Sequence, residues 1–290
     1  MSEFSQVIDT AFPVLSFSVD RDRLYLLCGC EILVYEAAYY ELVKSKRIFE
    51  KPGLARSLHL TPEYVVCKDF TNLTVFDREN LGRKAGWQLG EDLSSDICAL
   101  CSAENHIYAS LRDGRLARIG RDLKHDPEFR QVSGSAVWDM VLAEETLYAG
   151  NVDGWLLELD PATLETIKKI QAHRQNAKSL YANSGTLFSA SQDKSLAAWK
   201  IPGLEQLALK KGAHAKAFAI AGRYRDFLLT VSFPCGELKF WELPFLRESK
   251  RINLTKCLTG EAIIAGNFLY LVSRAENGVL RGDLARLVKA

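Results

Sequence analysis

Residues 146–154 read TLYAGNVDG, and related stretches stand before and after them at a constant spacing. Residues 106–114 read HIYASLRDG, and residues 186–194 read TLFSASQDK. The turn aspartates are 40 residues apart in both steps, from Asp113 to Asp153 and from Asp153 to Asp193. Each copy is a short β-rich run, a tight turn and a second alternating run. A repeat of this length built from short strands predicts a β-propeller blade.

The length of the chain sets the number of blades. Its 290 residues, at about 41 residues per repeat, give seven units. We therefore predict an all-β fold: a seven-bladed β-propeller whose blades are four-stranded antiparallel sheets. No Gly/Ser-rich linker or block of like charges divides the sequence, so residues 1–290 are predicted to form one domain.

Alternating hydrophobic runs give the expected strands of each blade. In the first two blades they cover residues 14–19, 23–28, 31–35, 57–60, 64–68 and 73–76. The next three blades begin at Ile97, Val137 and Ala177. In the last two blades they cover residues 218–220, 227–232, 238–241, 262–264, 268–273 and 278–282. Residues 36–42 lean helical, and we expect a distorted or extended connection there, before the outermost strand of the first blade.

Closure of the ring needs a partner for the last sheet. Residues 4–8 are strand-like and precede the first blade, so we predict that they supply the outermost strand of the seventh blade. The tail at residues 284–290 is the competing candidate for that place. Either solution removes an open sheet edge, which would invite aggregation.

The composition is that of a globular protein without a charge bias. Hydrophobic residues make up 48%, charged residues 25%, and the net charge is +1. No run is long and apolar enough to span a membrane, and the first residues lack the pattern of a signal peptide. Seven cysteines lie scattered in predicted strands, which indicates reduced thiols and a cytoplasmic location. Cys98 and Cys101 have CxxC spacing, but they point to opposite faces of a strand, so we assign no metal.

The fifth unit carries a family resemblance. It has Ala172-His173 at its start and residues 189–200, SASQDKSLAAWK, in its second half. This pattern resembles a WD-repeat, a family whose blades begin with Gly-His and end their third strand with Trp-Asp. The resemblance implies a polar network within the blade. Its members here would be His173, Ser189 or Ser191, Asp193 and Trp199.

Other units match the WD-repeat pattern less fully. The sixth keeps His214 and Trp241 but has no aspartate in its turn, and the fourth keeps Asp153 but lacks the tryptophan. Residues 147–160, LYAGNVDGWLLELD, also resemble repeats of pyrroloquinoline-quinone enzymes, which are larger propellers and usually secreted. We favour the WD-repeat interpretation because this chain has five tryptophans and no export signal.

No catalytic constellation is present in the sequence. It contains no GxSxG, HExxH or glycine-rich phosphate loop, and its five histidines are scattered along the chain. We therefore expect no catalysis, no cofactor and no metal. An enzyme or small-ligand binder with its site at the channel mouth remains the alternative class, because a ring can gather remote residues.

Propellers bind partners through loops around a central channel, and the WD-repeat resemblance places the binding face at the start of each innermost strand and in the turn after the second strand. The residues that match these positions are Arg56, Asp96, Trp138, Lys178, Lys216 and Phe218 for the strand starts, with Lys68, Arg112 and Gln192 for the turns. Cations with a large aromatic are typical of a protein-binding hot spot. Core packing is the other interpretation of Trp138 and Phe218.

The partner predicted from this set is a protein, or an acidic or phosphorylated peptide, because guanidinium groups grip carboxylates and phosphates in pairs. Nucleic acid is less favoured, since the balanced charge lacks a broad basic footprint. We predict a scaffold that acts as a monomer or as a subunit of a larger complex, with no membrane contact.

Overall fold

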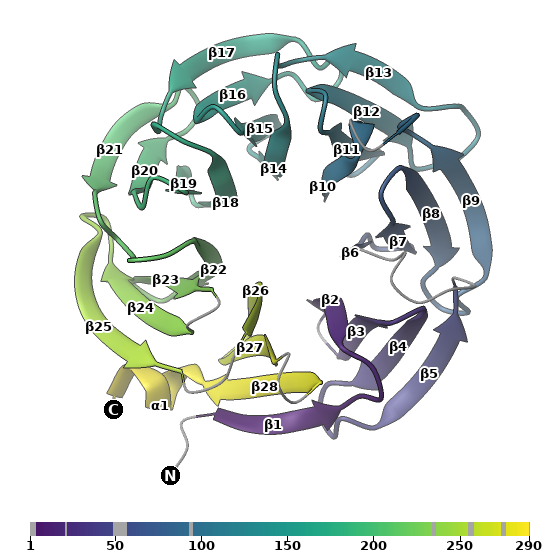
Figure 1. The fold of residues 1–290 in the computed structure, drawn as a ribbon, viewed down its shortest axis with the longest axis horizontal. Coiled ribbons are helices and arrows are strands. Elements are labelled where there is room, and N and C mark those ends of the chain that lie inside the picture. Colours follow the sequence, from purple (N-terminus) through teal and green to yellow (C-terminus); the bar gives the residue numbers. More distant parts are fainter. Residues whose placement is uncertain are drawn as a thin grey trace.

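Seven sheets stand around a central axis in the computed structural model (Figure 1). The structure describes residues 4–20, 22–48, 57–92, 95–233, 236–254, 258–273 and 277–289. Each sheet has four antiparallel strands, and their order follows the chain except in the last blade. The predicted seven-bladed propeller is therefore confirmed. Within the described residues no helix has the length and apolar character that crossing a membrane requires.

The first four blades follow one another directly, and their strands run from the channel outward. Blade 1 consists of β2 (Val14–Asp20), β3 (Arg23–Cys28), β4 (Glu31–Glu36) and β5 (Leu42–Arg47). Blade 2 consists of β6 (Ser57–Leu60), β7 (Tyr64–Lys68), β8 (Asn72–Asp77) and β9 (Arg83–Gln88). Blade 3 consists of β10 (Ile97–Ser102), β11 (His106–Leu111), β12 (Arg115–Gly120) and β13 (Glu128–Gln131). Blade 4 consists of β14 (Val137–Ala143), β15 (Thr146–Asn151), β16 (Trp155–Leu159) and β17 (Thr166–Gln171).

The remaining blades complete the ring. Blade 5 consists of β18 (Ala177–Asn183), β19 (Thr186–Ser191), β20 (Leu196–Lys200) and β21 (Glu205–Lys210). Blade 6 consists of β22 (Phe218–Tyr224), β23 (Phe227–Ser232), β24 (Glu237–Glu242) and β25 (Arg247–Asn253). Blade 7 consists of β26 (Leu258–Ala265), β27 (Phe268–Ser273), β28 (Gly278–Asp283) and β1 (Phe4–Asp9).

The two ends of the chain meet in blade 7, as predicted. β1 pairs antiparallel with β28, from Phe4 opposite Gly282 to Asp9 opposite Gly278 (Figure 1). The competing tail instead forms a short helix, α1 (Leu284–Lys289), whose Leu284 and Leu287 are buried against blades 6 and 7. The expected helical tendency of residues 36–42 is wrong, because a turn there leads directly into β5.

The hydrophobic core lies between the sheets. Among the described residues it divides into seven clusters, each shared by two neighbouring blades. Strand β3 shows how alternation produces this. Its Tyr25 and Leu27 pack toward blade 2, whereas Leu24 and Leu26 pack toward blade 7. Both faces of each sheet are thus buried, which is why the second strand of each blade is almost wholly apolar.

Glycine closes two of the repeated turns because backbone from the next loop lies against it. Gly114 and Gly154 have φ of 87° and 83°. A Cβ on Gly154 would stand 2.3 Å from the carbonyl oxygen of His173. The third copy has Lys194 at this position, with φ of 69°, so the repeat preserves the left-handed turn where it loses the glycine.

Gly154→Ala is expected to destabilise the protein by about 2 kcal/mol more than Gly203→Ala. Both glycines have positive φ, but nothing lies within 4 Å of a Cβ built on Gly203, so the difference isolates the collision with His173. Chemical denaturation of the two variants and the wild type measures it. Equal losses of unfolding free energy would show that the loop yields without cost.

Candidate partner-binding face

An extra residue interrupts the start of the innermost strand in neighbouring blades. The pairing of β10, β14 and β18 skips Cys98, Trp138 and Lys178, which are 40 residues apart. A bulge of this kind turns the extra residue out of the ladder. Trp138 is half-buried and Lys178 is exposed, so an aromatic side chain and a cation occupy equivalent places on adjacent blades.

Five of the predicted partner-binding residues are accessible. They are Arg112, Trp138, Lys178, Gln192 and Lys216. All five belong to strand starts or to turns that follow the second strand of a blade. We call the surface formed by these five residues the docking face. Arg112 forms an ion pair with Asp96, another of the predicted partner-binding residues, with 3.4 Å between Arg112 Nη2 and Asp96 Oδ2.

Three other predicted residues lie mainly inside the protein. Lys68 is only 8% exposed, and its Nζ donates a hydrogen bond of 2.7 Å to the carbonyl of Ile97 on the next blade. Phe218 is buried, with its ring centroid 4.6 Å from that of His214. Asp96 is buried apart from its contact with Arg112. The role predicted for Arg56 falls outside the described residues.

Lys68 hydrogen-bonds to the next blade, and Phe218 packs in the apolar cluster between blades 5 and 6. The accessible part of the predicted set is therefore smaller than the sequence pattern indicates. In the sequence, Lys68 and Phe218 stand at the same kinds of position within the repeat as the exposed members of the set. Contact with the neighbouring sheet decides their burial, and that contact has no signature in a single repeat.

Two carboxylates in the channel wall were not predicted from the sequence. Asp139 on β14 accepts the backbone N–H of Leu180 on β18 at 2.7 Å, and Glu261 on β26 accepts that of Phe17 on β2 at 2.8 Å. Ser16 and Ser179 accept backbone N–H groups of the next blade in the same way. Side chains of one blade thus satisfy the free edge of the next inner strand.

Burial in the channel wall changes the proton affinity of these groups. Loss of hydration raises the pKa of Asp139 to about 6, although two backbone N–H groups partly offset the rise. The same cause raises the pKa of Glu261 to about 7. Burial lowers the pKa of His59, on the innermost strand β6, to about 4, and its Nε2 lies 2.9 Å from the hydroxyl of Ser102. Burial disfavours the charged form in each case.

A continuous hydrogen-bond chain runs through blade 5. Trp199 Nε1 donates to Ser189 Oγ at 2.8 Å, and Ser189 Oγ lies 2.7 Å from His173 Nε2. On the other side of the ring, His173 Nδ1 lies 2.6 Å from Ser195 Oγ, whose hydroxyl donates to Asp193. This arrangement assigns the imidazole proton to Nδ1, because each hydroxyl then donates once and accepts once.

The chain contains four of the residues implied by the WD-repeat resemblance, and Ser195 connects them. Ser191 lies outside it and donates to the carbonyl of Gln175 at 3.1 Å. Burial lowers the pKa of His173 to about 4, so the ring is neutral at pH 7. Burial opposes ionisation of Asp193, but hydrogen bonds from Ser195 and the Arg174 N–H outweigh it and lower its pKa.

Blade 6 contains a second network, whose acidic member the sequence pattern did not reveal. Trp241 Nε1 donates to Thr230 Oγ1 at 2.7 Å, Thr230 Oγ1 lies 2.7 Å from His214 Nε2, and His214 Nδ1 lies 2.8 Å from Glu237. Glu237 thus supplies the acid that the turn lacks. Its position at the start of β24, facing a buried lysine, Lys239, is the signal that could have identified it.

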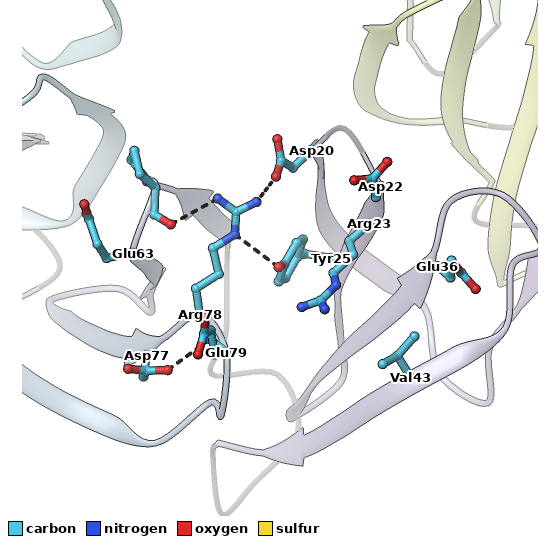
Figure 2. A pocket seen from close by; sticks show the side chains of 11 residues that line it. Asp20, Asp22, Arg23, Tyr25, Glu36, Val43, Glu63, Asp77, Arg78 and Glu79 are labelled. Atoms are coloured by element: carbon cyan, nitrogen blue, oxygen red, sulfur yellow. Dashed lines mark hydrogen bonds and ion pairs between the residues drawn. The ribbon is translucent and has the colours of Figure 1, made fainter.

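A polar cluster centred on Arg78, which we call the latch, joins blades 1 and 2 (Figure 2). Arg78 Nε donates to Tyr25 Oη at 3.1 Å, its Nη1 donates to the carbonyl of Thr61 at 3.1 Å, and its Nη2 pairs with Asp20. The latch forms one wall of a cavity of about 900 Å³ that carboxylates largely line. Because Arg78 donates hydrogen bonds to both blades, this arrangement stabilises the ring.

The hydrogen-bonding groups of the blade 5 network are used within the blade. Ser189 and His173 are buried, and their polar atoms are all engaged within the blade. Across the described residues, no group of three or more His, Cys, Asp or Glu side chains is arranged to hold a metal ion.

Known proteins resemble this chain in structure but not in sequence. No protein-family model and no curated protein matches the sequence. Solved structures do match. U3-55K has a TM-score of 0.81 with 14% identity over 97% of this chain and 98% of its own. The WD40 repeats of RRP9 give 0.81 and 14% over 97% of both chains, and a chain of the mitotic checkpoint complex gives 0.80 and 12% over 97% and 93%.

This chain has the WD40-repeat propeller fold. The resemblance read from the fifth unit is thus confirmed at the level of fold, over nearly the whole chain. At sequence identities this low, the matches are evidence for the fold alone. The departures from the WD40 pattern have a physical explanation in blade 6, where Glu237 takes the place of a turn aspartate.

Ser189→Ala is expected to lower the free energy of unfolding by about 2–4 kcal/mol, because it leaves both His173 Nε2 and Trp199 Nε1 buried without a partner. Ser45→Ala on the exposed outer strand β5 makes the same chemical change and should cost less than about 0.5 kcal/mol. Urea denaturation compares them. Similar costs for the two variants would refute the hydrogen-bond chain.

Glu261→Gln is expected to make stability less dependent on pH. The folded pKa of about 7 exceeds the ordinary 4.5, so protonation favours the folded state at low pH, and this contribution is lost as the pH rises through 7. Glutamine keeps the acceptor for Phe17 without the charge. The variant should therefore gain on the order of 1–3 kcal/mol over wild type near pH 8 and nothing near pH 4.

Exposed Glu205 on β21 offers the matched control, because Glu205→Gln should show no such pH-dependent difference from wild type. Taking each variant relative to wild type also cancels the opposite contribution of the buried histidines. A constant difference between Glu261→Gln and wild type from about pH 4 to about pH 8 would contradict the buried-carboxylate account.

Proposed function

We propose that this propeller is a non-catalytic scaffold that binds a protein partner through an acidic or phosphorylated segment laid on the docking face. The observation that carries the proposal is the placement of Trp138 and Lys178 at equivalent bulges of adjacent inner strands. An aromatic anchor with a cation on the adjacent blade is the composition of a binding hot spot.

Charge supports an acidic partner. Lys178 and Lys216 are exposed on neighbouring strand starts, and Arg112 is half-exposed. The only acidic member of the predicted set, Asp96, is buried and paired with Arg112. The accessible part of the docking face is therefore cationic, although the chain as a whole has a net charge of only +1. Such a local field favours the approach of carboxylates and phosphates.

The fold supports a place in an assembly. A chain of the mitotic checkpoint complex has the same backbone arrangement. We propose by analogy that this protein also works as a subunit, and that its location is cytoplasmic. The five described cysteines support a reducing compartment, because all are unpaired thiols and four of them are buried.

Charge reversal at the docking face, Lys178→Glu with Lys216→Glu, is expected to abolish partner capture without a measurable change in melting temperature, because both side chains are exposed. The control is Lys200→Glu, an exposed lysine at the other end of the same blade. Affinity purification with quantitative mass spectrometry compares the three proteins. A partner that the double variant retains at wild-type level would place the interface elsewhere.

A further inference from the structure

A cavity of about 320 Å³ opens beside the docking face, between the outermost strands of blades 4 and 5. Three segments form it: the loop after β17, the turn between β19 and β20, and the end of β21. The side chains that matter for its chemistry are His173, Arg174, Asp193, Ser195, Leu209 and Lys211. None of the residues predicted for partner binding lines it.

The floor of the cavity is internally satisfied. Asp193 accepts the hydroxyl and the backbone N–H of Ser195, and its other oxygen accepts the backbone N–H of Arg174 at 2.8 Å. His173 is neutral at pH 7, since burial lowers its pKa to about 4. The carboxylate of Asp193 therefore accepts hydrogen bonds from its own loop and turn, and both ring nitrogens of His173 are also engaged.

The rim carries two cations without partners. Arg174 and Lys211 are both exposed, and neither the guanidinium nor the ammonium group forms an ion pair or hydrogen bond with another residue that the structure describes. Two unpaired cations at one concave site attract an anion that bridges them.

The wall provides an apolar surface next to these charges. Leu209 on the outermost strand β21 is 40% exposed and lines the same cavity. An exposed leucine beside two cations is suited to a ligand that has an anionic group and a neighbouring apolar side chain. A peptide segment has this combination, and an isolated inorganic anion does not.

We propose that this cavity receives a phosphorylated serine or threonine of the partner, with Arg174 and Lys211 holding the phosphate and Leu209 contacting an apolar side chain beside it. The inference rests on the proposed function and names the place where the anionic group is read. A phosphate monoester carries a charge of about −1.5 to −2 at neutral pH and has three acceptor oxygens, so it attracts both rim cations more strongly than a singly charged carboxylate does. The negative charge of Asp193 on the floor is meanwhile engaged by hydrogen bonds from Ser195 and the Arg174 N–H.

The test uses the whole protein and a peptide pool with a fixed phosphoserine and randomised flanking positions. Immobilised wild type is expected to retain this pool, to enrich apolar residues next to the phosphoserine, and to release the same pool with unmodified serine. Arg174→Gln with Lys211→Gln should weaken the best retained peptide at least roughly tenfold. The loop should stay in place, because the backbone of Arg174, not its side chain, binds Asp193.

The matched control is Lys200→Gln with Arg225→Gln, which removes the same charge from exposed positions at the ends of β20 and β22 that lie away from the cavity. It should bind the phosphopeptide like wild type. The inference is overturned if the phosphorylated pool is not retained, if an aspartate pool binds equally well, or if the cavity variant binds like the control. Displacement of the phosphopeptide by single-stranded DNA at equal phosphate concentration would assign the cations to nucleic acid instead.

The outcome is separable from that of the proposed function. Loss of partner capture in the Lys178→Glu and Lys216→Glu variant tests the docking face, whatever the peptide pool shows. Failure of the pool experiment with intact dependence of capture on the docking face would leave the scaffold and remove only the phosphate cavity.

Discussion

Each sheet of this ring buries one face against the preceding blade and the other against the following blade, and the remaining features of the structure depend on that arrangement. The seven described apolar clusters are all intersheet clusters, so no blade has a core of its own. A missing last strand would expose blade 7 next to blade 1. The pairing of β1 with β28 prevents this and ties together segments from the two ends of the chain.

Burial of both sheet faces leaves the inner edge of every blade to be satisfied across a blade boundary. The first strand has a neighbour on one side only, and its free backbone groups point into the channel wall. Side chains of the adjacent blade meet several of them, with serine at Ser16 and Ser179 and with a carboxylate at Asp139 and Glu261. A carboxylate makes a stronger acceptor than a hydroxyl but has to be desolvated, which explains why its pKa rises.

The fold could be predicted from the sequence because its determinants are local and periodic. Strand alternation and the recurring Asp-containing turn locate the strands, and the number of repeats closes the ring. The candidate site was only partly predictable. Lys68 and Lys178 look alike in sequence, yet one reaches across a blade boundary to a carbonyl and the other meets solvent. Glu237 could not be predicted because it does not stand at the turn position where the repeat has an aspartate, and only the folded structure brings it to His214.

The two polar networks explain why the cations gather where they do. His173 and His214 each fasten the loop that leads into a blade, and both are fully engaged beneath the surface. Arg174 follows His173 directly, and Lys216 stands two residues after His214. Each buried imidazole thus fixes the backbone that presents an exposed cation. A loop held in this way loses little conformational entropy on binding, so under the proposed function the networks would favour recognition without touching the partner.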